Sequence, residues 1–299
     1  MLKKVIIATD LSNNSEALLG CLGGLKAYGT QRCLILLCLG LQETTSIAFS
    51  QSMHRLEQSL QIQKESLEKQ GYIVEARAIT GDLTDEINRT AMGEGYSAIV
   101  VGAHRSSMIS ELFFSGIADD VIHHAQKPVF VIRLEDKLKD GEPCVEAVGC
   151  NISNHILFPT DFSINADVAF SYLTEIAARG AKKITLLHIQ DKVRISPYLD
   201  NRLEEFDEID NKRLQKMKNT LQEKGDAAVE IVLKYGSPTV EIIKLVNEQN
   251  VKLVVMGNQG RGFVKELFLG SVSNNIARLS PSSVLLVPMN RRARPASAI

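Results

Sequence analysis

The sequence predicts an α/β protein of two tandem, doubly wound domains, each with a five-stranded parallel sheet flanked by helices. The chain has 299 residues, which is enough for two domains of ordinary size. It carries the same series of motifs in both halves. Its strand-like segments are continuous apolar runs separated by helix-like segments, which is typical of parallel strands buried on both faces.

The repeat is clearest where each half begins. The first half opens with KKVIIATDLSNNSEALL and the second with NHILFPTDFSINADVAF, and both contain Thr-Asp-x-Ser-x-Asn after an apolar run. Asp10 therefore corresponds to Asp161, and further along Gly102 corresponds to Gly257. We expect a domain over 1–133, a charged linker rich in Gly, Pro and Cys over 134–153, a second domain over 154–290 and a tail over 291–299.

Strands and helices alternate within each copy. In the first half we expect strands near 3–9, 33–39, 72–79, 98–101 and 129–132. In the second half we expect strands at 155–160, 183–189, 228–235, 252–257 and 283–288, with helices over 165–178, 201–223, 238–249 and 271–279.

Two of these helices carry further signals. Ser237 and Pro238 suit the N-cap and first position of the third helix. The helix over 201–223 is amphipathic, and its expected core-facing side chains are Leu203, Phe206, Ile209, Leu214, Met217 and Leu221.

Composition excludes several classes of function. The chain is 44% apolar and 23% charged, with a net charge of −1. This balance argues against nucleic acid or an anionic membrane as the main partner. No apolar run approaches the roughly 20 residues of a membrane span, and the start of the sequence lacks a signal-peptide pattern. We therefore expect an intracellular, cytoplasmic protein.

The cysteines and histidines form no recognisable metal or disulfide pattern. Five cysteines occur without a C-x-x-C pair, and Cys33 and Cys38 lie in an apparently buried strand, so reduced thiols are expected. His123 and His124 are adjacent on a helix and do not share a face. The spacing of Cys144, Cys150 and His155 matches no zinc pattern, and no metal site is expected.

The second half contains a glycine-rich segment directly after its fourth strand. In MGNQGRGFVKELFLGS, Gly257 and Gly260 enclose two residues, and Gly270-Ser271 opens the last helix. Glycines allow positive φ and close approach to an anion, and a helix N-terminus suits phosphate. If strands one and four are neighbours, Asp161 faces the same crevice at their carboxyl ends. The segment therefore predicts a phosphate site.

A purely structural reading of each residue stays open at this point. Asp161 could cap the helix after it or the preceding turn, and Gly257 could simply end a strand. Gly270 could be a helix-start glycine, and Arg261 could be an exposed loop residue without ligand contact.

These motifs resemble the universal stress protein family in its tandem form. FPTDFS, LLHI, GSP and above all Gly257-x2-Gly260-x9-Gly270-Ser271 match the motif of the family's ATP-binding class. The resemblance implies strand order 3-2-1-4-5 with adenosine between strands one and four. It assigns Asp161 to the adenosine with Pro159 and Thr160 beside it, Ile189 to the base, Met256 to the ribose, and Gly257, Gly260, Arg261, Gly270, Ser271, Val272 and Ser273 to the phosphates.

The first half departs from this motif. Asp10 and Gly102 are kept, but Arg105 stands where the second half has Gly260, and Ser115-Gly116 reverses Gly270-Ser271. Arginine does not adopt positive φ as easily as glycine. We therefore expect ATP to bind mainly to the second half.

The sequence favours a regulatory stress-response protein that binds ATP, accompanied by Mg or Mn, with weak hydrolysis at most. It lacks a P-loop and a G-x-S-x-G elbow. The alternatives are a slow ATPase or nucleotidyl-transfer enzyme on the same fold, or a nucleotide-free interaction module. The apolar last strand of each half invites edge pairing. We expect an intramolecular pseudo-dimer of the halves and a possible homodimer.

Overall fold

The computed structural model describes residues 2–9, 11, 13–39, 48–104, 117–139, 142–148, 150–190, 203–260 and 269–289. Its strands are β1 (Lys4–Thr9), β2 (Arg32–Leu39), β3 (Ile73–Thr80), β4 (Ala98–His104), β5 (Val129–Lys139), β6 (Glu142–Ala147), β7 (Ile156–Thr160), β8 (Lys183–Gln190), β9 (Ala228–Tyr235), β10 (Leu253–Gly257) and β11 (Ser283–Val287). The helices are α1 (Asn13–Cys21), the 3-10 helix η1 (Leu22–Tyr28), α2 (Ala48–Lys69), α3 (Leu83–Gly93), α4 (Ile117–His124), α5 (Ile164–Ala177), α7 (Leu203–Gln222), α8 (Pro238–Glu248) and α9 (Ser271–Leu279).

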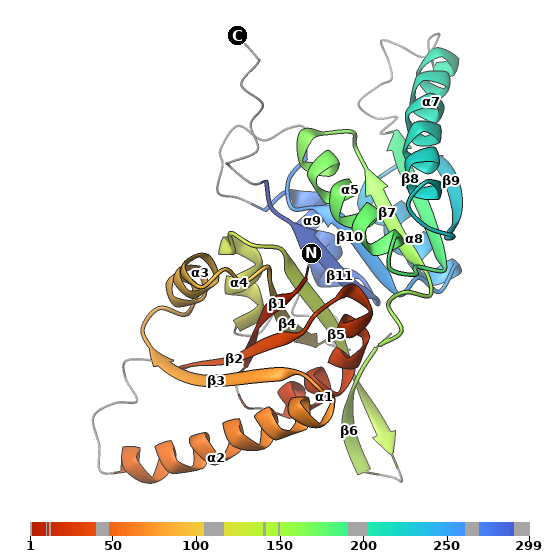
Figure 1. Cartoon of the computed structure of the whole chain (residues 1–299). Helices are drawn as coiled ribbons and strands as arrows, with labels where there is room; N and C mark the ends of the chain where they lie inside the picture. The colour runs from red at the N-terminus through yellow and green to blue at the C-terminus, as the bar shows by residue number, and fades with distance from the viewer. Residues whose placement is uncertain are drawn as a thin grey trace, which may run out of the picture.

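One sheet of 11 strands runs through the whole molecule (Figure 1). Its main path is β3-β2-β1-β4-β5-β11-β10-β7-β8-β9, and β6 pairs with β5 off this path. Read from its own edge, each half therefore has the predicted order 3-2-1-4-5. Every strand that was predicted is present, and all but β5, which runs seven residues beyond its expected end, lie within a few residues of the expected bounds.

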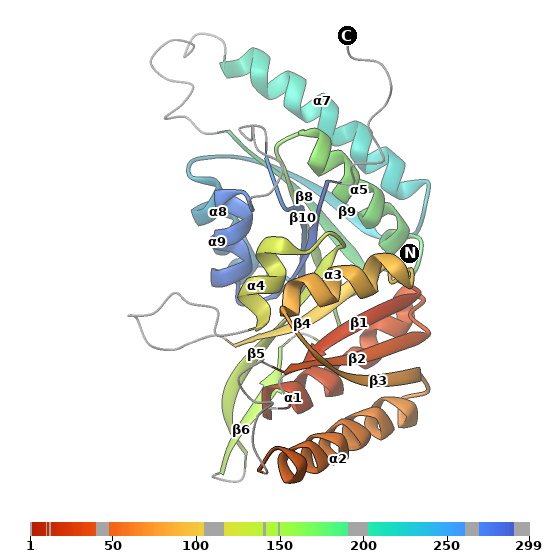
Figure 2. The same cartoon turned by 90° about the vertical axis from the view of Figure 1, so that its left-hand side faces the viewer.

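Helices cover both faces of this sheet (Figure 2). Neighbouring residues of β1 point to opposite sides, so Val5 and Ile7 join one core cluster while Ile6 and Ala8 join the other. The first cluster continues from the first half into α5 of the second, through Ala169. Such alternation of buried residues is what two covered faces require.

The two halves meet edge to edge. β5 and β11 pair antiparallel, with Val131 opposite Val284 and Phe130 opposite Leu285. Arg133, which is fully buried, donates from its backbone N–H to Ser283 Oγ at 3.2 Å and from Nη2 to the carbonyl of Ala277 in α9 at 2.5 Å. This arrangement is the expected pairing of the halves within one chain.

The stretch expected as a linker contains regular structure. β5 continues to Lys139 and forms an antiparallel hairpin with β6, in which Lys137 and Glu146 form an ion pair at 2.8 Å. Val145 and Ala147 pack against the first core cluster. After Leu134, the described residues of this ribbon are half-buried or exposed, which agrees with its largely polar sequence.

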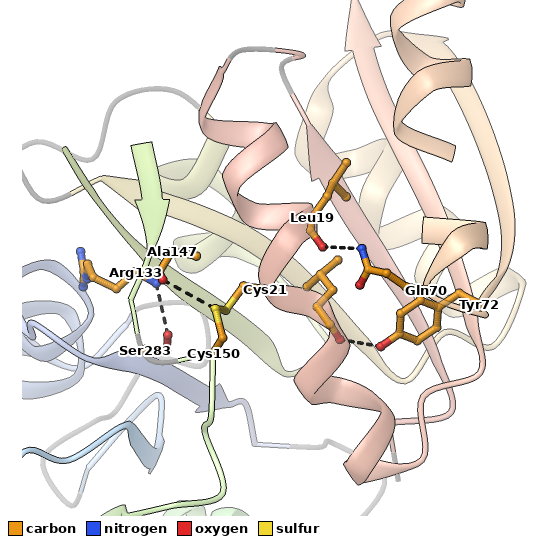
Figure 3. Close-up of a disulfide and its surroundings, with 9 residues drawn as sticks. Leu19, Cys21, Gln70, Tyr72, Arg133, Ala147, Cys150 and Ser283 are labelled. Carbon is orange, nitrogen blue, oxygen red and sulfur yellow. Dashed lines mark hydrogen bonds between the residues drawn. A yellow bond between two sulfur atoms is a disulfide. The ribbon is translucent and has the colours of Figure 1, made fainter. Parts of the chain in front are cut away.

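The expectation of reduced cysteines is wrong for one pair. Cys21 at the end of α1 forms a disulfide with Cys150, 129 residues later, with their Cα atoms 5.0 Å apart (Figure 3). Cys33 and Cys144 are outside any disulfide. Burial raises the pKa of the Cys33 thiol to about 12, which makes this thiol unreactive.

The amphipathic face predicted for α7 is partly wrong. Leu214 and Leu221 are fully buried, but Ile209 is 39% exposed and Asp210 is 9% exposed. On the buried face of α7, the Asp210 carboxylate therefore lies where the sequence predicted the side chain of Ile209. At the start of α8, Ser237 is the N-cap and Pro238 follows as predicted, although the Ser237 side chain makes no capping hydrogen bond.

None of the helices in the described ranges has the length and apolar character to cross a membrane.

Candidate functional site

The candidate site lies at the carboxyl ends of β7 and β10. These strands are parallel neighbours, with Leu253 opposite Ile156 and Val254 opposite Leu157. Asp161 follows β7 and Gly257 ends β10, so both leave the sheet at the same edge. This is the point at which the strand order reverses, where open α/β sheets bind ligands. The predicted juxtaposition is confirmed.

A tight turn carries Asp161 away from β7. The Thr160 hydroxyl accepts a hydrogen bond from the Phe162 N–H at 3.0 Å, and Asp161 Oδ1 accepts one from the Ser163 N–H at 3.0 Å. Phe162 has a φ of 56°, which non-glycine residues rarely adopt. The N-cap of α5 is Ser163, whose hydroxyl accepts from the Ala166 N–H at 3.2 Å. Asp161 therefore shapes the turn before the helix rather than capping the helix itself.

The loop after β10 comes directly up to this turn. A Cβ added to Gly260 would lie 2.9 Å from Asp161 Oδ2, and a Cβ on Gly257 would lie 2.5 Å from Asn165 Oδ1. A Cβ on Gly270 would lie 3.4 Å from both the Asn258 carbonyl oxygen and the Gln259 Cα. The three glycines thus mark the places where the loop, the Asp161 turn and the start of α9 approach most closely.

The expected reason for these glycines needs correction. None of Gly257, Gly260 and Gly270 has a positive φ, and Gly270 is extended at φ −63° and ψ 147°. Other residues could adopt these backbone angles. Glycine is favoured at Gly257 and Gly260 because a side chain there would collide with its neighbours, whereas a Cβ at Gly270 would make ordinary contact. Sequence alone does not distinguish such crowding from a conformational need.

Asn165 links the segments of the site through hydrogen bonds, although no role was predicted for it from the sequence. Its side chain is 1% exposed; Nδ2 donates to the Val287 carbonyl at 3.1 Å and Oδ1 accepts from the Gln259 N–H at 2.8 Å. It therefore links α5 to β11 and to the loop after β10. The Asn of the repeated Thr-Asp-x-Ser-x-Asn pattern was the signal that could have identified it.

The N-terminus of α9 faces the same loop. Its N-cap Gly270 has no side chain to offer, and the Gly270 N–H donates to the Asn258 carbonyl at 2.7 Å. The first backbone N–H groups of a helix have no partner within the helix. The N–H groups of Ser271, Val272 and Ser273 are therefore placed to bind an anion. The Ser273 hydroxyl is committed elsewhere, since it donates to the Gly257 carbonyl at 2.8 Å.

The apolar members of the predicted set lie around the strand ends. Pro159 is buried in β7, and Met256 in β10 is 6% exposed. Ile189 near the end of β8 and Val272 in α9 are partly buried and pack against the second core cluster. Together with the turn, they surround the carboxyl edge from three neighbouring strands and a helix.

Some predicted residues lie outside the described ranges. These are Arg261 in the second half, and Asp10, Arg105, Ser115 and Gly116 in the first. Gly102 is described, and a Cβ there would lie 2.9 Å from Leu134 Cδ1 of β5. Its close neighbour is a core leucine, whereas that of Gly257 is the polar Asn165. Across the described ranges, no group of three His, Cys, Asp or Glu side chains could hold a metal ion.

Comparison with known proteins identifies the family of both halves. The model of the universal stress protein family matches residues 1–133 and 153–288. Universal stress protein MJ0577 of Methanocaldococcus jannaschii is 31% identical over 150 residues, which cover 44% of this chain and 93% of that protein. A putative universal stress protein of Staphylococcus haemolyticus is 33% identical over 137 residues, covering 44% of this chain and 83% of the relative.

Solved structures also match nearly the whole chain. A universal stress protein from Archaeoglobus fulgidus has a TM-score of 0.75 and 22% identity, over 96% of this chain and 99% of its own. At that identity the likeness shows the fold alone. The family model, in contrast, matches most of the sequence in two separate segments. The chain therefore belongs to the universal stress protein family and carries two of its domains in tandem.

Proposed function

We propose that the second half binds one adenine nucleotide, preferably ATP, and that the protein is a regulatory member of the stress response with little or no hydrolysis. The observation that carries this proposal is the close packing of Gly260 against Asp161 beside the uncapped N-terminus of α9. Anions favour such a helix end, because its N–H groups point outward and its dipole is positive there.

The residues at the carboxyl edge fit this ligand. The N–H groups of Ser271, Val272 and Ser273 would hold phosphate oxygens, and the Asp161 carboxylate would accept hydrogen bonds from the ribose. Ile189 would line the base, Met256 would pack near the ribose, and Pro159 would lie beside Asp161 at the adenosine. The helix dipole contributes only about 0.3–2 kcal/mol, whereas micromolar binding needs about 8 kcal/mol. Burial of the base and several backbone hydrogen bonds must therefore supply most of the affinity.

A divalent cation, Mg²⁺ or Mn²⁺, would enter with the phosphates. Mg²⁺ commonly binds through substrate phosphates and water rather than a cage of protein ligands. The absence of a three-ligand cluster in the described ranges is compatible with this mode.

The last strand of each half already has its pairing partner within the chain. β5 and β11 pair with each other, so a homodimer would have to use another surface. We propose that the protein acts in the cytoplasm, through a surface near the candidate site that changes when nucleotide binds.

Calorimetric titration with ATP and Mg²⁺ tests the proposal. Wild type is compared with Gly270→Asp, which adds a negative charge, and with Gly270→Asn, a neutral side chain of nearly the same shape. Asp and Asn are both good N-cap residues, so both variants should fold. We expect about one ATP per wild-type chain, no measurable binding in Gly270→Asp, and weaker but detectable binding in Gly270→Asn.

Other outcomes would favour other functions. Two ATP molecules bound per chain with similar affinity would contradict the assignment to the second half. If ATP gives wild type neither a heat of binding nor a rise in melting temperature, the nucleotide-free interaction module becomes the favoured function. A ligand selective for the folded state must stabilise that state. Sustained release of phosphate or pyrophosphate would indicate an enzyme.

A further inference from the structure

A buried histidine is hydrogen-bonded to the turn that carries Asp161. His188 lies in β8, next to β7, and is 8% exposed. Its Nδ1 lies 2.7 Å from the Thr160 carbonyl oxygen, and because a carbonyl only accepts, Nδ1 must donate. Its Nε2 lies 3.3 Å from Asp210 Oδ2. The imidazole therefore connects the residue before Asp161 to helix α7.

Asp210 is the centre of a polar cluster beneath α7. Its carboxylate also accepts hydrogen bonds from Gln190 Nε2 at 3.0 Å and from Arg213 Nη1 at 3.5 Å. Burying a carboxylate is costly unless it is paired and hydrogen-bonded. Replacing such a network with apolar side chains is often neutral or stabilising, so stability alone gives little reason for a carboxylate here.

The same cluster holds the other side of the turn. The ring of Phe162 stacks against His188 with their centroids 4.5 Å apart, and the Arg213 guanidinium lies 5.2 Å from the Phe162 ring centroid. Asp161 thus lies between two residues that are each held by His188, one through its carbonyl and one through its ring.

In the first half, the part of the turn that the structure describes forms without this cluster. The repeat places Leu11 at the position of Phe162 and Leu37 at that of His188. Leu11 has a φ of 59°, and its N–H donates to the Thr9 hydroxyl at 3.1 Å, just as Phe162 does to Thr160. Leu37 is 4% exposed. There the Thr9 hydroxyl instead donates to Gln63 Oε1 of α2 at 3.3 Å. The histidine and the carboxylate are therefore particular to the half that carries the intact glycine motif.

We propose that His188 and Asp210 are positioning residues of the nucleotide site. They hold the backbone of the Asp161 turn in the form that receives the nucleotide, and they couple this turn to α7. This inference rests on the proposed function, but the position of the turn can also be measured without nucleotide.

His155 provides a matched control for His188. It is also a buried histidine of the second half, 7% exposed, with Nδ1 3.1 Å from the Gln249 carbonyl and Nε2 2.9 Å from Thr185 Oγ1. It precedes β7 and so lies at the amino edge of the sheet, opposite the candidate site. Replacing either histidine with asparagine removes a buried hydrogen-bonded ring, and only His188 touches the Asp161 turn.

The first measurement is the affinity for ATP, by calorimetry, together with the melting temperature. We expect both His188→Asn and His155→Asn to melt below wild type. His188→Asn should weaken ATP binding by at least about tenfold, while His155→Asn should stay within about twofold of wild type. Asp210→Asn should weaken binding too, and the double variant should lose little more than His188→Asn because the two residues act as one unit.

The second measurement is hydrogen exchange of the Phe162 and Ser163 amides in the nucleotide-free protein. These N–H groups make the two hydrogen bonds of the turn. We expect both to exchange at least about tenfold faster in His188→Asn than in His155→Asn. If wild type binds no ATP, the proposed function fails, and this exchange still decides whether His188 positions the turn.

Unchanged exchange in His188→Asn would overturn the positioning role, even if binding weakened. Unchanged affinity, or an equal loss in His155→Asn, would overturn the link to the nucleotide. Should His188→Asn fail to fold, Asp210→Asn carries the same two expectations.

Discussion

Gly260 and Asp161 are in such close contact that one methyl group would separate the loop from the turn. Gly260 is exposed, so little core packing depends on it. A side chain there would nonetheless have to displace the Asp161 carboxylate, whose Oδ2 lies 2.9 Å from the position of the new Cβ. A substitution at Gly260 should therefore weaken nucleotide binding while changing the free energy of unfolding only slightly.

We predict that Gly260→Ala weakens ATP binding by about tenfold and changes the free energy of unfolding by less than about 1 kcal/mol. Gly93→Ala is the control, because a Cβ there meets nothing within 4 Å. Titration calorimetry and urea unfolding on the same samples give both quantities. Equal affinity in Gly260→Ala and wild type would show that the close approach does not matter for the ligand.

His155 makes stability depend on pH. Burial is the largest cause that lowers the pKa of this imidazole below its usual 6.5, and the nearby Lys183 also lowers it. The unfolded chain then binds a proton more readily than the folded one. With His155 neutral, the free energy of unfolding keeps its full value above about pH 6.5. It decreases as the pH falls toward the lowered pKa of this histidine.

We predict that the free energy of unfolding falls less steeply in His155→Asn than in wild type between about pH 7.5 and pH 5.5. Urea unfolding at both pH values measures the difference. Parallel curves for the two proteins would mean that His155 does not contribute to the acid sensitivity.

Sequence identified the residue types of the site but not all of their roles. Asp161 and the three glycines follow from their spacing and from the strands before them. The collision of a Cβ with Asn165 or Asp161 depends on segments about 100 residues apart, so no local pattern predicts it. Asp210 was missed for a similar reason, since only the partners brought by β8 make its burial possible.

At the scale of elements, helix α5 begins directly after Ser163, a residue type that is favoured at the N-cap. Ser163 is an N-cap with extended backbone, and its hydroxyl accepts from Ala166 N–H. The turn before it and the helix after it both carry site residues, namely Asp161 and Asn165. The cap therefore fixes the helix start that positions both.

We predict that Ser163→Ala lowers the free energy of unfolding by about 1 kcal/mol, the usual cost of losing such a cap. Ser163→Asp should restore most of it, because Asp also caps and its charge suits a helix N-terminus. Chemical unfolding of the three proteins makes the comparison. An alanine variant as stable as wild type would mean that the cap is redundant.

Apolar strands were readily predicted, and the ribbon of β5 and β6 was not. Continuous runs such as that of β10 indicate burial on both faces. Residues 134–147 are instead rich in charged side chains, and few of them meet the core. With Gly and Pro in its sequence as well, such a segment has the composition of a linker.

At the scale of the whole molecule, the strand pair β5–β11 joins the halves, as the apolar last strands predicted. The disulfide Cys21–Cys150 instead ties the stretch expected as a linker back to α1 of the first half. No sequence pattern indicated this bond, because its cysteines are 129 residues apart. The burial of Cys21, at 5% exposure, places this bond against the core.

We predict that Cys21→Ser lowers the free energy of unfolding by about 2–5 kcal/mol under oxidising conditions, because a disulfide that closes a long loop restricts the unfolded chain strongly. Under reducing conditions the variant and wild type should unfold at similar denaturant concentrations. Cys33→Ser, which changes a thiol outside any disulfide, is the comparison for the loss of a buried sulfur.

The disulfide also makes a covalent ring of nearly the whole first half. A single cut by a protease anywhere between Cys21 and Cys150 would open that ring without releasing either piece. The nicked protein would still run as one band on a denaturing gel and would separate into two fragments only after a thiol reductant is added. After such a cut in this half, both of its pieces would stay attached to the second half until the disulfide is reduced.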